Sequence, residues 1–460
     1  MTGSFIGRKR ELARLDAAWA SGDFEFVVLY GRRRVGKSFL LKHFFEDKPG
    51  IYYQALRKNN LEAMSSSVSD FIHGNPDMLY PSFSAMFRDI AAASKEKRLY
   101  LVIDEIPYLA GETEIISLLQ QFIDNVFIST KLMLVLCGSS RSFMEQEVLA
   151  EPSPLYGRRT MQIKLLPFRA EESAEFLPSS WPLRDIAAAH AICSGVPYYE
   201  KFLKSYPSLE EGIREEFFSP RTLFYEARLY LMSEYRAVES YYTLLELLAG
   251  GKNEVKALSD KSKLSVANIS AMLASLERQE IVQRNCKILG KGRGRGWKLT
   301  DGYLAFYFRY VHSHIQQIEE DSAEGPYRKA MEELDSFVGR FIEKDFRSYV
   351  LRTSGEAIKA IGSLDFPNPV TKQNEELDLV ADASDSVITG ECKWKGGRTG
   401  LEEFETLIRR SALLFPSEPV KYCILSRSGF TEELAAAAEE RDDLRLITGP
   451  ELFGCPEGKD

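Results

Sequence analysis

Three apolar runs stand out in the first 140 residues of the chain. They predict strands over residues 26–30, 99–103 and 131–137, and the chain between them reads as amphipathic helices. A strand without polar alternation is typical of a parallel sheet that is covered on both faces. Strands that alternate with helices form βαβ units. Residues 1–235 are therefore predicted to be an α/β domain around a parallel sheet.

The pattern changes between residues 236 and 315. A helix is expected over residues 240–248, and a short second helix begins at 256. Ser265 is a predicted N-cap of a third helix. The apolar stripe of that helix consists of Ile269, Met272, Leu273 and Leu276. A hairpin with strands near 281 and 298 follows, and this order predicts a winged-helix domain.

Residues 316–460 return to mixed strands and helices. A helix over 337–343 precedes strands near 357–361, 375–381 and 387–394; a helix over about 400–415, a strand over 420–425 and a last helix and strand follow. We therefore predict three domains, over residues 1–235, 236–315 and 316–460, the last one α/β.

Composition narrows the functional classes. The 460 residues suffice for two to four domains, and a net charge of −8 provides no general attraction for nucleic acid. The six cysteines lack metal-ligand spacing, which favours reduced thiols. The N-terminus carries no signal-peptide pattern, and no apolar run approaches the length of a membrane span. We expect a soluble, cytoplasmic protein without a membrane partner.

Residues 31–38 form a complete phosphate-binding loop, GRRRVGKS, between the first predicted strand and a helix. In such a loop the backbone N–H groups surround phosphates, Lys37 reaches the terminal phosphates, and Ser38 places a hydroxyl on Mg²⁺. The sequence thus predicts a nucleoside triphosphate and Mg²⁺ as ligands. The predicted nucleotide-binding residues here are Gly31, Arg32, Arg33, Arg34, Val35, Gly36, Lys37, Ser38 and Phe39.

Two acids follow the second predicted strand. Ligands gather at the carboxyl ends of parallel strands, so Asp104 is expected to hold Mg²⁺ through a water and Glu105 to polarise the attacking water. The alternative is that both acids cap the next helix. The third strand ends at Gly138, and either Ser139 or Ser140 is expected to sense the γ-phosphate, although Gly-Ser is also ordinary turn chemistry.

The hairpin of the second domain is strongly basic. Residues 284–298 contain six basic side chains and no acid, which fits phosphate contact. The outward face of the preceding helix offers little for reading base edges: it presents Asn268, Ala271, Ser275 and Arg278. We expect nucleic-acid binding of low sequence specificity, with a solvated basic loop as the alternative.

A second group of candidate residues lies in the third domain. Asp378 and Glu391 are thirteen residues apart, enough for one hairpin that lays their strands side by side. Glu391 and Lys393 share a strand face. Asp378 and Glu391 are predicted to bind Mg²⁺ between them, with Lys393 beside the attacking water. The alternative is that Glu391 and Lys393 are simply alternating polar residues on a half-exposed strand.

The order of motifs resembles that of archaeal-type ATPases of the STAND/AAA+ group. Besides residues 31–38 and 104–105, the motifs are FIGRKREL at 5–12, LYGRR at 155–159, LLPF at 165–168 and CSGVPYY at 193–199. The resemblance implies ATP as the nucleotide, with the FIGR box near the adenine and the turn at Pro197 helping to close the pocket. It also implies that Arg158 or Arg159 contacts the γ-phosphate, the alternative being a solvated salt-bridging pair. Winged helices in this group often act as lids over the nucleotide, and a homo-oligomer is left open.

The third domain resembles the PD-(D/E)xK nuclease core. The element order αβββαβ is that of the core, and the resemblance implies that Glu343 is its helical acid beside Asp378, Glu391 and Lys393. No proline precedes Asp378, and many copies of this fold are catalytically inactive. The sequence therefore predicts an ATPase whose slow hydrolysis switches Mg²⁺-dependent nucleic-acid binding or cleavage. The alternative is an ATP-gated DNA-binding or signalling protein whose nuclease-like domain is inactive.

Overall fold

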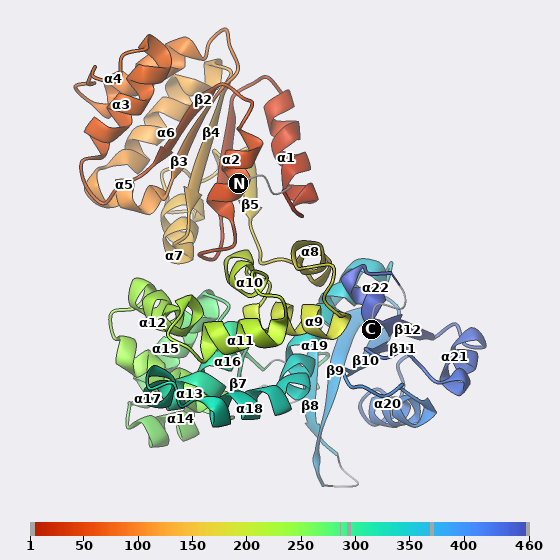
Figure 1. Ribbon diagram of the computed structural model, residues 1–460. Helices are drawn as coiled ribbons and strands as arrows, with labels where there is room; N and C mark the ends of the chain where they lie inside the picture. Colours follow the sequence, from red (N-terminus) through yellow and green to blue (C-terminus); the bar gives the residue numbers. More distant parts are fainter. Residues whose placement is uncertain (1–4, 286, 292–295, 369–371, 457–460) are drawn as a thin grey trace. The chain divides into compact units, whose positions relative to one another are not determined.

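A computed structural model describes residues 5–456 except 286, 292–295 and 369–371. The chain divides into two compact units, Met1–Pro167 and Phe168–Asp460 (Figure 1). The predicted domain boundaries at residues 235 and 315 both fall inside the second unit and stay predictions. No helix among the described residues is long and apolar enough to span a membrane.

The first unit is built on a parallel sheet of five strands in the order β2-β3-β4-β1-β5. The strands are β1 (Glu25–Tyr30), β2 (Gly50–Gln54), β3 (Leu99–Asp104), β4 (Leu132–Gly138) and β5 (Met161–Lys164). The side chains of β3 and β4 are all buried, as expected for central strands with helices on both faces. The predicted parallel sheet is confirmed.

Helices cover both faces of this sheet (Figure 1). One face packs against α1 (Lys9–Ala20) and α2 (Lys37–Phe44). The other packs against α3 (Asn60–His73), α4 (Phe83–Ala93), α5 (Ile106–Glu112) and α6 (Ile115–Asn125). A 3₁₀ helix over Phe127–Ser129, the short helix α7 (Arg141–Phe143) and a π-helix over Met144–Leu149 complete the unit.

The second unit begins with a helical region. Its helices are α8 (Ala170–Phe176), α9 (Leu183–Cys193), α10 (Pro197–Leu203), α11 (Leu209–Phe217), α12 (Thr222–Glu234), α13 (Val238–Ala249), α14 (Val255–Ser262) and α15 (Val266–Arg278). The side chain of Ser265 accepts a hydrogen bond from Asn268 N and caps α15, and the predicted apolar stripe of α15 is buried. The antiparallel pair β6 (Val282–Arg284) and β7 (Trp297–Leu299) follows.

Further helices connect this region to a mixed sheet. They are α16 (Gly302–Phe306), α17 (Ile315–Glu319), α18 (Glu324–Glu332) and the long α19 (Leu334–Thr353), with short turns over Tyr307–Val311 and His312–His314. The sheet has the order β12-β11-β10-β9-β8. Its strands are β8 (Ile358–Pro367), β9 (Asn374–Ala383), β10 (Val387–Lys393), β11 (Val420–Ser426) and β12 (Leu444–Thr448).

The first three strands of the mixed sheet are antiparallel, and β10, β11 and β12 are parallel. Helices α20 (Leu401–Leu414) and α21 (Glu432–Glu439) complete the predicted order of elements, and α22 (Gly449–Phe453) follows β12 beyond it. The predicted α/β fold class is confirmed: a unit around a parallel sheet is followed by a C-terminal domain with a mixed sheet.

Candidate nucleotide and metal sites

The phosphate-binding loop connects β1 to α2 at the carboxyl edge of the sheet. A Cβ on Gly31 would lie 2.3 Å from the carbonyl oxygen of Leu165, so only glycine fits there. Gly36 caps α2 with a φ of 95°, a conformation that glycine adopts without strain. The positive end of the α2 dipole therefore lies at residues 36–37, as anion binding requires.

Lys37 is buried at the start of α2. Its ammonium group donates hydrogen bonds of 2.9 Å to the carbonyl oxygens of Gly31 and Arg32. Burial lowers the pKa of Lys37, while the neighbouring groups Cys137, Glu105 and Asp104 act in the opposite direction. The side chain thus holds a cation inside the loop where a phosphate chain would be enclosed.

Asp104 ends β3 and is almost completely buried, with 1% of its surface exposed. Its Oδ2 accepts hydrogen bonds of 2.6 Å from Ser38 Oγ and from Tyr52 Oη, and its Oδ1 accepts one of 3.0 Å from Glu105 N. A hydroxyl and a carboxylate in contact are the hard oxygen donors that Mg²⁺ prefers, so this pair fits the ion. The structure brings Ser38 and Asp104 together, and it adds Tyr52.

Glu105 follows Asp104 in a left-handed backbone conformation with a φ of 55°. Its carboxylate accepts hydrogen bonds from Ser139 Oγ at 2.9 Å and from Ser139 N at 3.3 Å. Of the two serines considered from the sequence, Ser139 is therefore the one in contact with Glu105. The contact joins the ends of β3 and β4.

Three rings lie together beside the loop. Phe5 stacks on His43 with ring centroids 4.0 Å apart and on Phe39 at 5.6 Å. Phe39 is 63% exposed, so part of its ring remains open to a ligand. The buried guanidinium group of Arg8 donates to the carbonyl oxygens of Val35 and Leu166 and ties the N-terminal segment to the loop. His43 was not among the residues predicted for this site.

The second unit carries a compact group of carboxylates. Oxygen atoms of Glu343 from α19 and of Glu376 and Asp378 from β9 all lie within 4.8 Å of one another. Glu343 and Asp378 were candidates from the sequence, and Glu376 was missed. Its position two residues before Asp378, on a predicted strand, was the available signal.

Electrostatics favour protons on two of these acids, Glu343 and Asp378. Burial and then the charge of Asp378 raise the pKa of Glu343 to about 8. Burial and then the charge of Glu391 raise the pKa of Asp378 to about 7. Asp378 also accepts a hydrogen bond of 2.8 Å from Cys392 N, and Arg347 lies 3.6 Å from Glu343. Three carboxylates that repel one another fit a divalent cation, which would relieve that repulsion.

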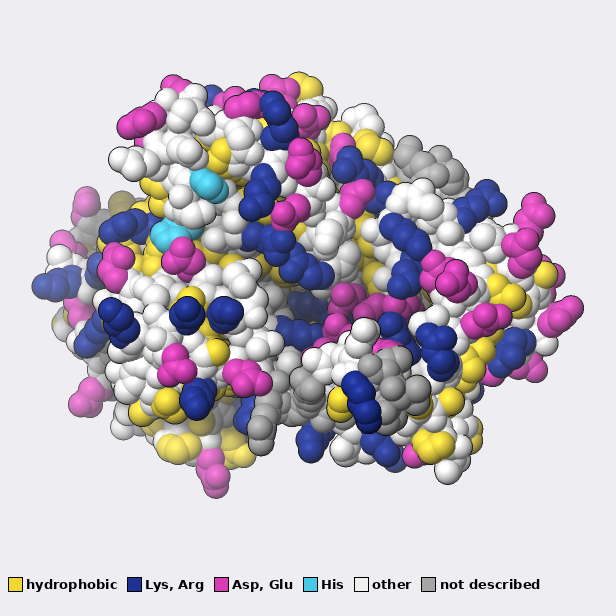
Figure 2. Space-filling model, turned by 90° about the horizontal axis from the view of Figure 1, so that it is seen from below, with side chains coloured by type: hydrophobic (Ala, Val, Ile, Leu, Met, Phe, Trp, Pro, Cys, Tyr) yellow, Lys and Arg dark blue, Asp and Glu magenta, His cyan; other side chains and the backbone are white. Residues whose placement is uncertain are grey.

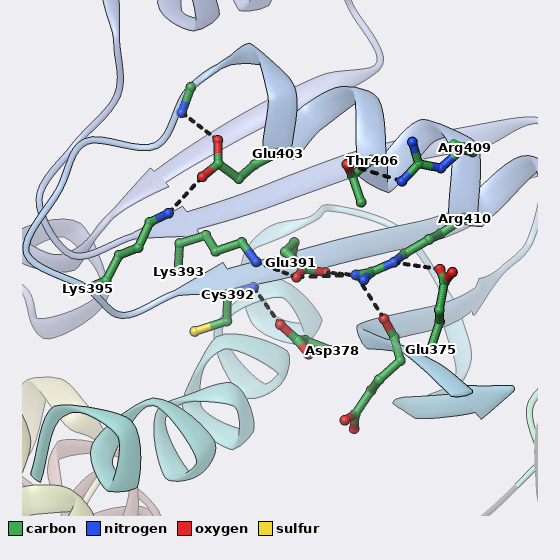
Figure 3. Close-up of polar contacts among 12 residues, drawn as sticks. Glu375, Asp378, Glu391, Cys392, Lys393, Lys395, Glu403, Thr406, Arg409 and Arg410 are labelled. Carbon is green, nitrogen blue, oxygen red and sulfur yellow. Dashed lines mark hydrogen bonds and ion pairs between the residues drawn. The ribbon is translucent and has the colours of Figure 1, made fainter. Parts of the chain in front are cut away.

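Glu391 lies on the neighbouring strand in an ion-pair network (Figure 3). Its Oε1 accepts a hydrogen bond of 2.7 Å from Lys393 Nζ, and its Oε2 lies 3.4 Å from Arg410 Nη1. Arg410 also pairs with Glu375 at 2.9 Å. The predicted Mg²⁺ site between Asp378 and Glu391 stays a prediction, because the close group contains Glu343 and Glu376 in place of Glu391.

The basic hairpin packs on the mixed sheet through its described residues. Lys298 Nζ lies 2.6 Å from Glu376 Oε1, 3.2 Å from Ser363 Oγ and 3.9 Å from Asp365 Oδ2. Ile288 is buried among apolar residues of the mixed sheet. Figure 2 shows basic and acidic side chains gathered around a central hollow on the face of the second unit that it views. The predicted basic residues Arg293 and Arg295 lie outside the described residues.

Comparison with known families agrees with the loop geometry. Residues 5–186 match the family described as ATPase domain predominantly from Archaea. This segment is similar to archaeal-type ATPase domains. Residues 307–406 match a family of archaeal and bacterial proteins of unknown function.

Two curated relatives come from Methanocaldococcus jannaschii. An uncharacterized protein is 28% identical over 432 residues, which are 91% of this chain and 94% of the relative. An uncharacterized ATP-binding protein is 48% identical over 44 residues, 10% of this chain and 75% of the relative. The solved structure of a Walker-type ATPase of Pyrococcus abyssi aligns with 66% of this chain and 96% of its own chain. The TM-score is 0.52 at 21% sequence identity, which indicates the same fold.

Arg158 and Pro197 were also predicted for the nucleotide site. Arg158 pairs with both carboxylate oxygens of Asp124 at 2.6 and 2.8 Å and donates to the carbonyl oxygen of Pro154. Pro197 begins α10 in the second unit, after the turn in which Gly195 O accepts a hydrogen bond from Phe168 N. The roles predicted for Arg158 and Pro197 stay predictions.

Proposed function

We propose that this protein is an ATP-driven switch whose ATPase domain controls Mg²⁺-dependent binding or cleavage of nucleic acid by the C-terminal domain. The observation that carries the ATPase part is the contact of Ser38 with buried Asp104 beside the buried ammonium group of Lys37. This arrangement offers a cation for the phosphates and an oxygen pair for Mg²⁺ in one place.

The resting contacts support a defined sequence of events in the ATPase domain. Backbone N–H groups and Lys37 bind the phosphates, and bound Mg²⁺ would neutralise part of their charge. Glu105 is the base that orients the attacking water. In the structure its carboxylate is held by Ser139. A γ-phosphate that accepts a hydrogen bond from the Ser139 hydroxyl would release the Glu105 carboxylate. Glu105 would then orient the attacking water only while a triphosphate is bound.

In the C-terminal domain the acids Glu343, Glu376 and Asp378 would hold the divalent cation. Lys393 would then lie near the water that attacks a phosphodiester. The basic residues of the 284–298 hairpin other than Lys298, which pairs with Glu376, would add phosphate contacts without reading the sequence. The proposed partner is therefore nucleic acid of low sequence specificity.

A cleavage assay tests this part of the proposal. Labelled DNA and RNA are incubated with the full chain, Mg²⁺ and ATP. We expect cleavage that falls by about 100-fold or more in Lys393→Ala, because a general acid–base or electrostatic group contributes about 10²–10⁴-fold. Lys395→Ala is the matched control, since Lys395 pairs with Glu403 at 2.7 Å, outside the carboxylate group (Figure 3). Cleavage that is equal in parent and Lys393→Ala would contradict nuclease function.

A second candidate function is an ATP-gated binding or signalling protein with an inactive C-terminal domain. The observation that favours it is charge neutralisation: Lys298 pairs with Glu376, and Lys393 pairs with Glu391. A domain neutralised in this way would bind nucleic acid or a partner without metal. Nucleic-acid binding that persists in EDTA, without any cleavage in Mg²⁺, would support this candidate.

Metal binding by the carboxylate group is a separate prediction. Titration with Mn²⁺, followed by its EPR signal in the full chain without nucleotide, should show one site whose affinity rises between about pH 6 and 9. The sign follows from the raised pKa values of Glu343 and Asp378, because protons must leave both acids before a cation binds. Glu376→Gln should weaken binding about tenfold or more.

The control for this titration is Glu375→Gln. Glu375 neighbours Glu376 but pairs with Arg410 and Asn368 instead of joining the carboxylate group. Its substitution should leave the Mn²⁺ affinity within about twofold. Equal affinities in parent and Glu376→Gln at every pH would contradict a metal site here.

A further inference from the structure

We infer that Tyr52 is a positioning residue for the ATPase reaction, one that fixes the Asp104 carboxylate in the orientation that Mg²⁺ requires. Tyr52 lies on β2, and its hydroxyl donates to Asp104 Oδ2 at 2.6 Å. The inference rests on the Mg²⁺-dependent ATPase function proposed above. It adds a residue that belongs neither to the phosphate-binding loop nor to the strand with the two acids.

The strand register explains why Tyr52 reaches Asp104. In the parallel pair of β2 and β3, Tyr52 is opposite Val102 and Gln54 is opposite Asp104. Opposite residues of parallel strands share a face, and residues two apart on a strand share a face. Tyr52 and Asp104 are therefore diagonal neighbours on one face of the sheet, the face that α2 covers.

The surroundings of Tyr52 keep its hydroxyl a donor. The hydroxyl is the donor in its hydrogen bond of 2.6 Å to Asp104 Oδ2. Lys42 Nζ lies 5.3 Å from the centre of the Tyr52 ring, so a cation covers one face of the ring. Lys42 is one turn after Ser38 on α2, which places it on the same side of the helix.

The other donors to Asp104 have different tasks. Ser38 would use its hydroxyl oxygen as a metal ligand, and Glu105 N belongs to the backbone next to the base. Tyr52 contributes a side-chain hydrogen bond and no ligand atom. Without it, a carboxylate with 1% exposure loses one of its side-chain donors and gains freedom to rotate. Such outer contacts to metal ligands typically change metal affinity about 10–100-fold.

Tyr53 provides a matched control. It is the next residue on β2, and its side chain packs into the core on the opposite face of the sheet. Its hydroxyl donates to Asn60 Oδ1 at 2.7 Å, away from Asp104. Tyr52→Phe and Tyr53→Phe therefore each remove one hydroxyl from neighbouring positions, and only the first touches the Asp104 carboxylate.

The experiment is a calorimetric titration of Mg²⁺ into the full chain saturated with a non-hydrolysable ATP analogue. Tyr52→Phe should weaken the Mg²⁺ affinity about tenfold, and Tyr53→Phe should stay within about twofold of the parent. The affinity for the analogue in EDTA should be equal in all three proteins. Mn²⁺ EPR of the same complexes gives a second readout, and Tyr52→His, which keeps a ring N–H donor, should recover part of the affinity.

Two results would overturn the inference. One is an unchanged Mg²⁺ affinity and Mn²⁺ spectrum in folded Tyr52→Phe, as judged by circular-dichroism melting. The other is an equal loss in Tyr53→Phe, which would show a general effect of losing a buried hydroxyl on β2. A parent chain that binds the analogue neither in EDTA nor in Mg²⁺ would instead overturn the proposed ATPase function, and the inference with it.

Discussion

Lys37→Ala is expected to lower the affinity for ATP by about 100-fold or more. The reason is that Lys37 is the buried cation of the loop, bonded to Gly31 O and Arg32 O, and its loss leaves phosphate charge without a partner. Hydrogen bonds to charged groups contribute about 1.5–3 kcal/mol each, and every 1.4 kcal/mol is about tenfold in affinity. Fluorescence of a labelled ATP analogue measures the effect directly.

Lys131→Ala is the control for this substitution. Lys131 is exposed and precedes β4 at the opposite end of the strand from the phosphate-binding loop. The Lys131→Ala variant should bind the labelled ATP analogue with the affinity of the parent. An ATP affinity of Lys37→Ala equal to that of Lys131→Ala would mean that the loop does not enclose the triphosphate.

Glu105→Gln is expected to slow ATP hydrolysis by about 10²–10⁴-fold, the usual contribution of a general base. ATP binding should be retained, because the loop, Lys37 and Asp104 are unchanged. The amide can still accept a hydrogen bond from Ser139, so the local fold should persist. Phosphate release under single-turnover conditions measures the chemical step.

Glu114→Gln is the matched control, since Glu114 is an exposed acid that precedes α6. It should hydrolyse ATP at the parent rate. If Glu105→Gln also kept that rate, Glu105 would not be the base, and its contact with Ser139 would be only structural.

The sequence predicts the central strands of the first unit well because burial on both faces leaves continuous apolar runs. Strands β1, β3 and β4 were recognised in this way. Strands β2 and β5 lie at the edges of the sheet, and only some of their residues are buried. Their mixed sequences, GIYYQ and MQIK, therefore lack the signal that identifies a central strand.

The candidate sites were predictable where the chemistry is local in sequence. The phosphate-binding loop and the pair of acids at residues 104–105 are contiguous motifs, and the structure brings Ser38 and Asp104 into contact. Tyr52 and Glu376 were missed because their roles depend on partners from other strands or helices. A tyrosine on a short edge strand carries no local sign that its hydroxyl reaches an acid 52 residues later.

The basic hairpin shows another limit of sequence reasoning. Counting charges predicts a wing that grips phosphates, but Lys298 is already paired with Glu376, and Ile288 is buried among residues of the mixed sheet. A sequence shows the charge of a segment without the acids that fold against it. Such pairing is decided by tertiary packing, which is why the neutralised carboxylates emerged only from the structure.

A calorimetric titration of ATP with Mg²⁺ into the purified full chain tests the proposed nucleotide site. This site should give a single binding event with about one nucleotide per chain, and no such event in Lys37→Ala. Absence of heat from the parent chain, at protein concentrations that would detect micromolar affinity and at two temperatures, would contradict it.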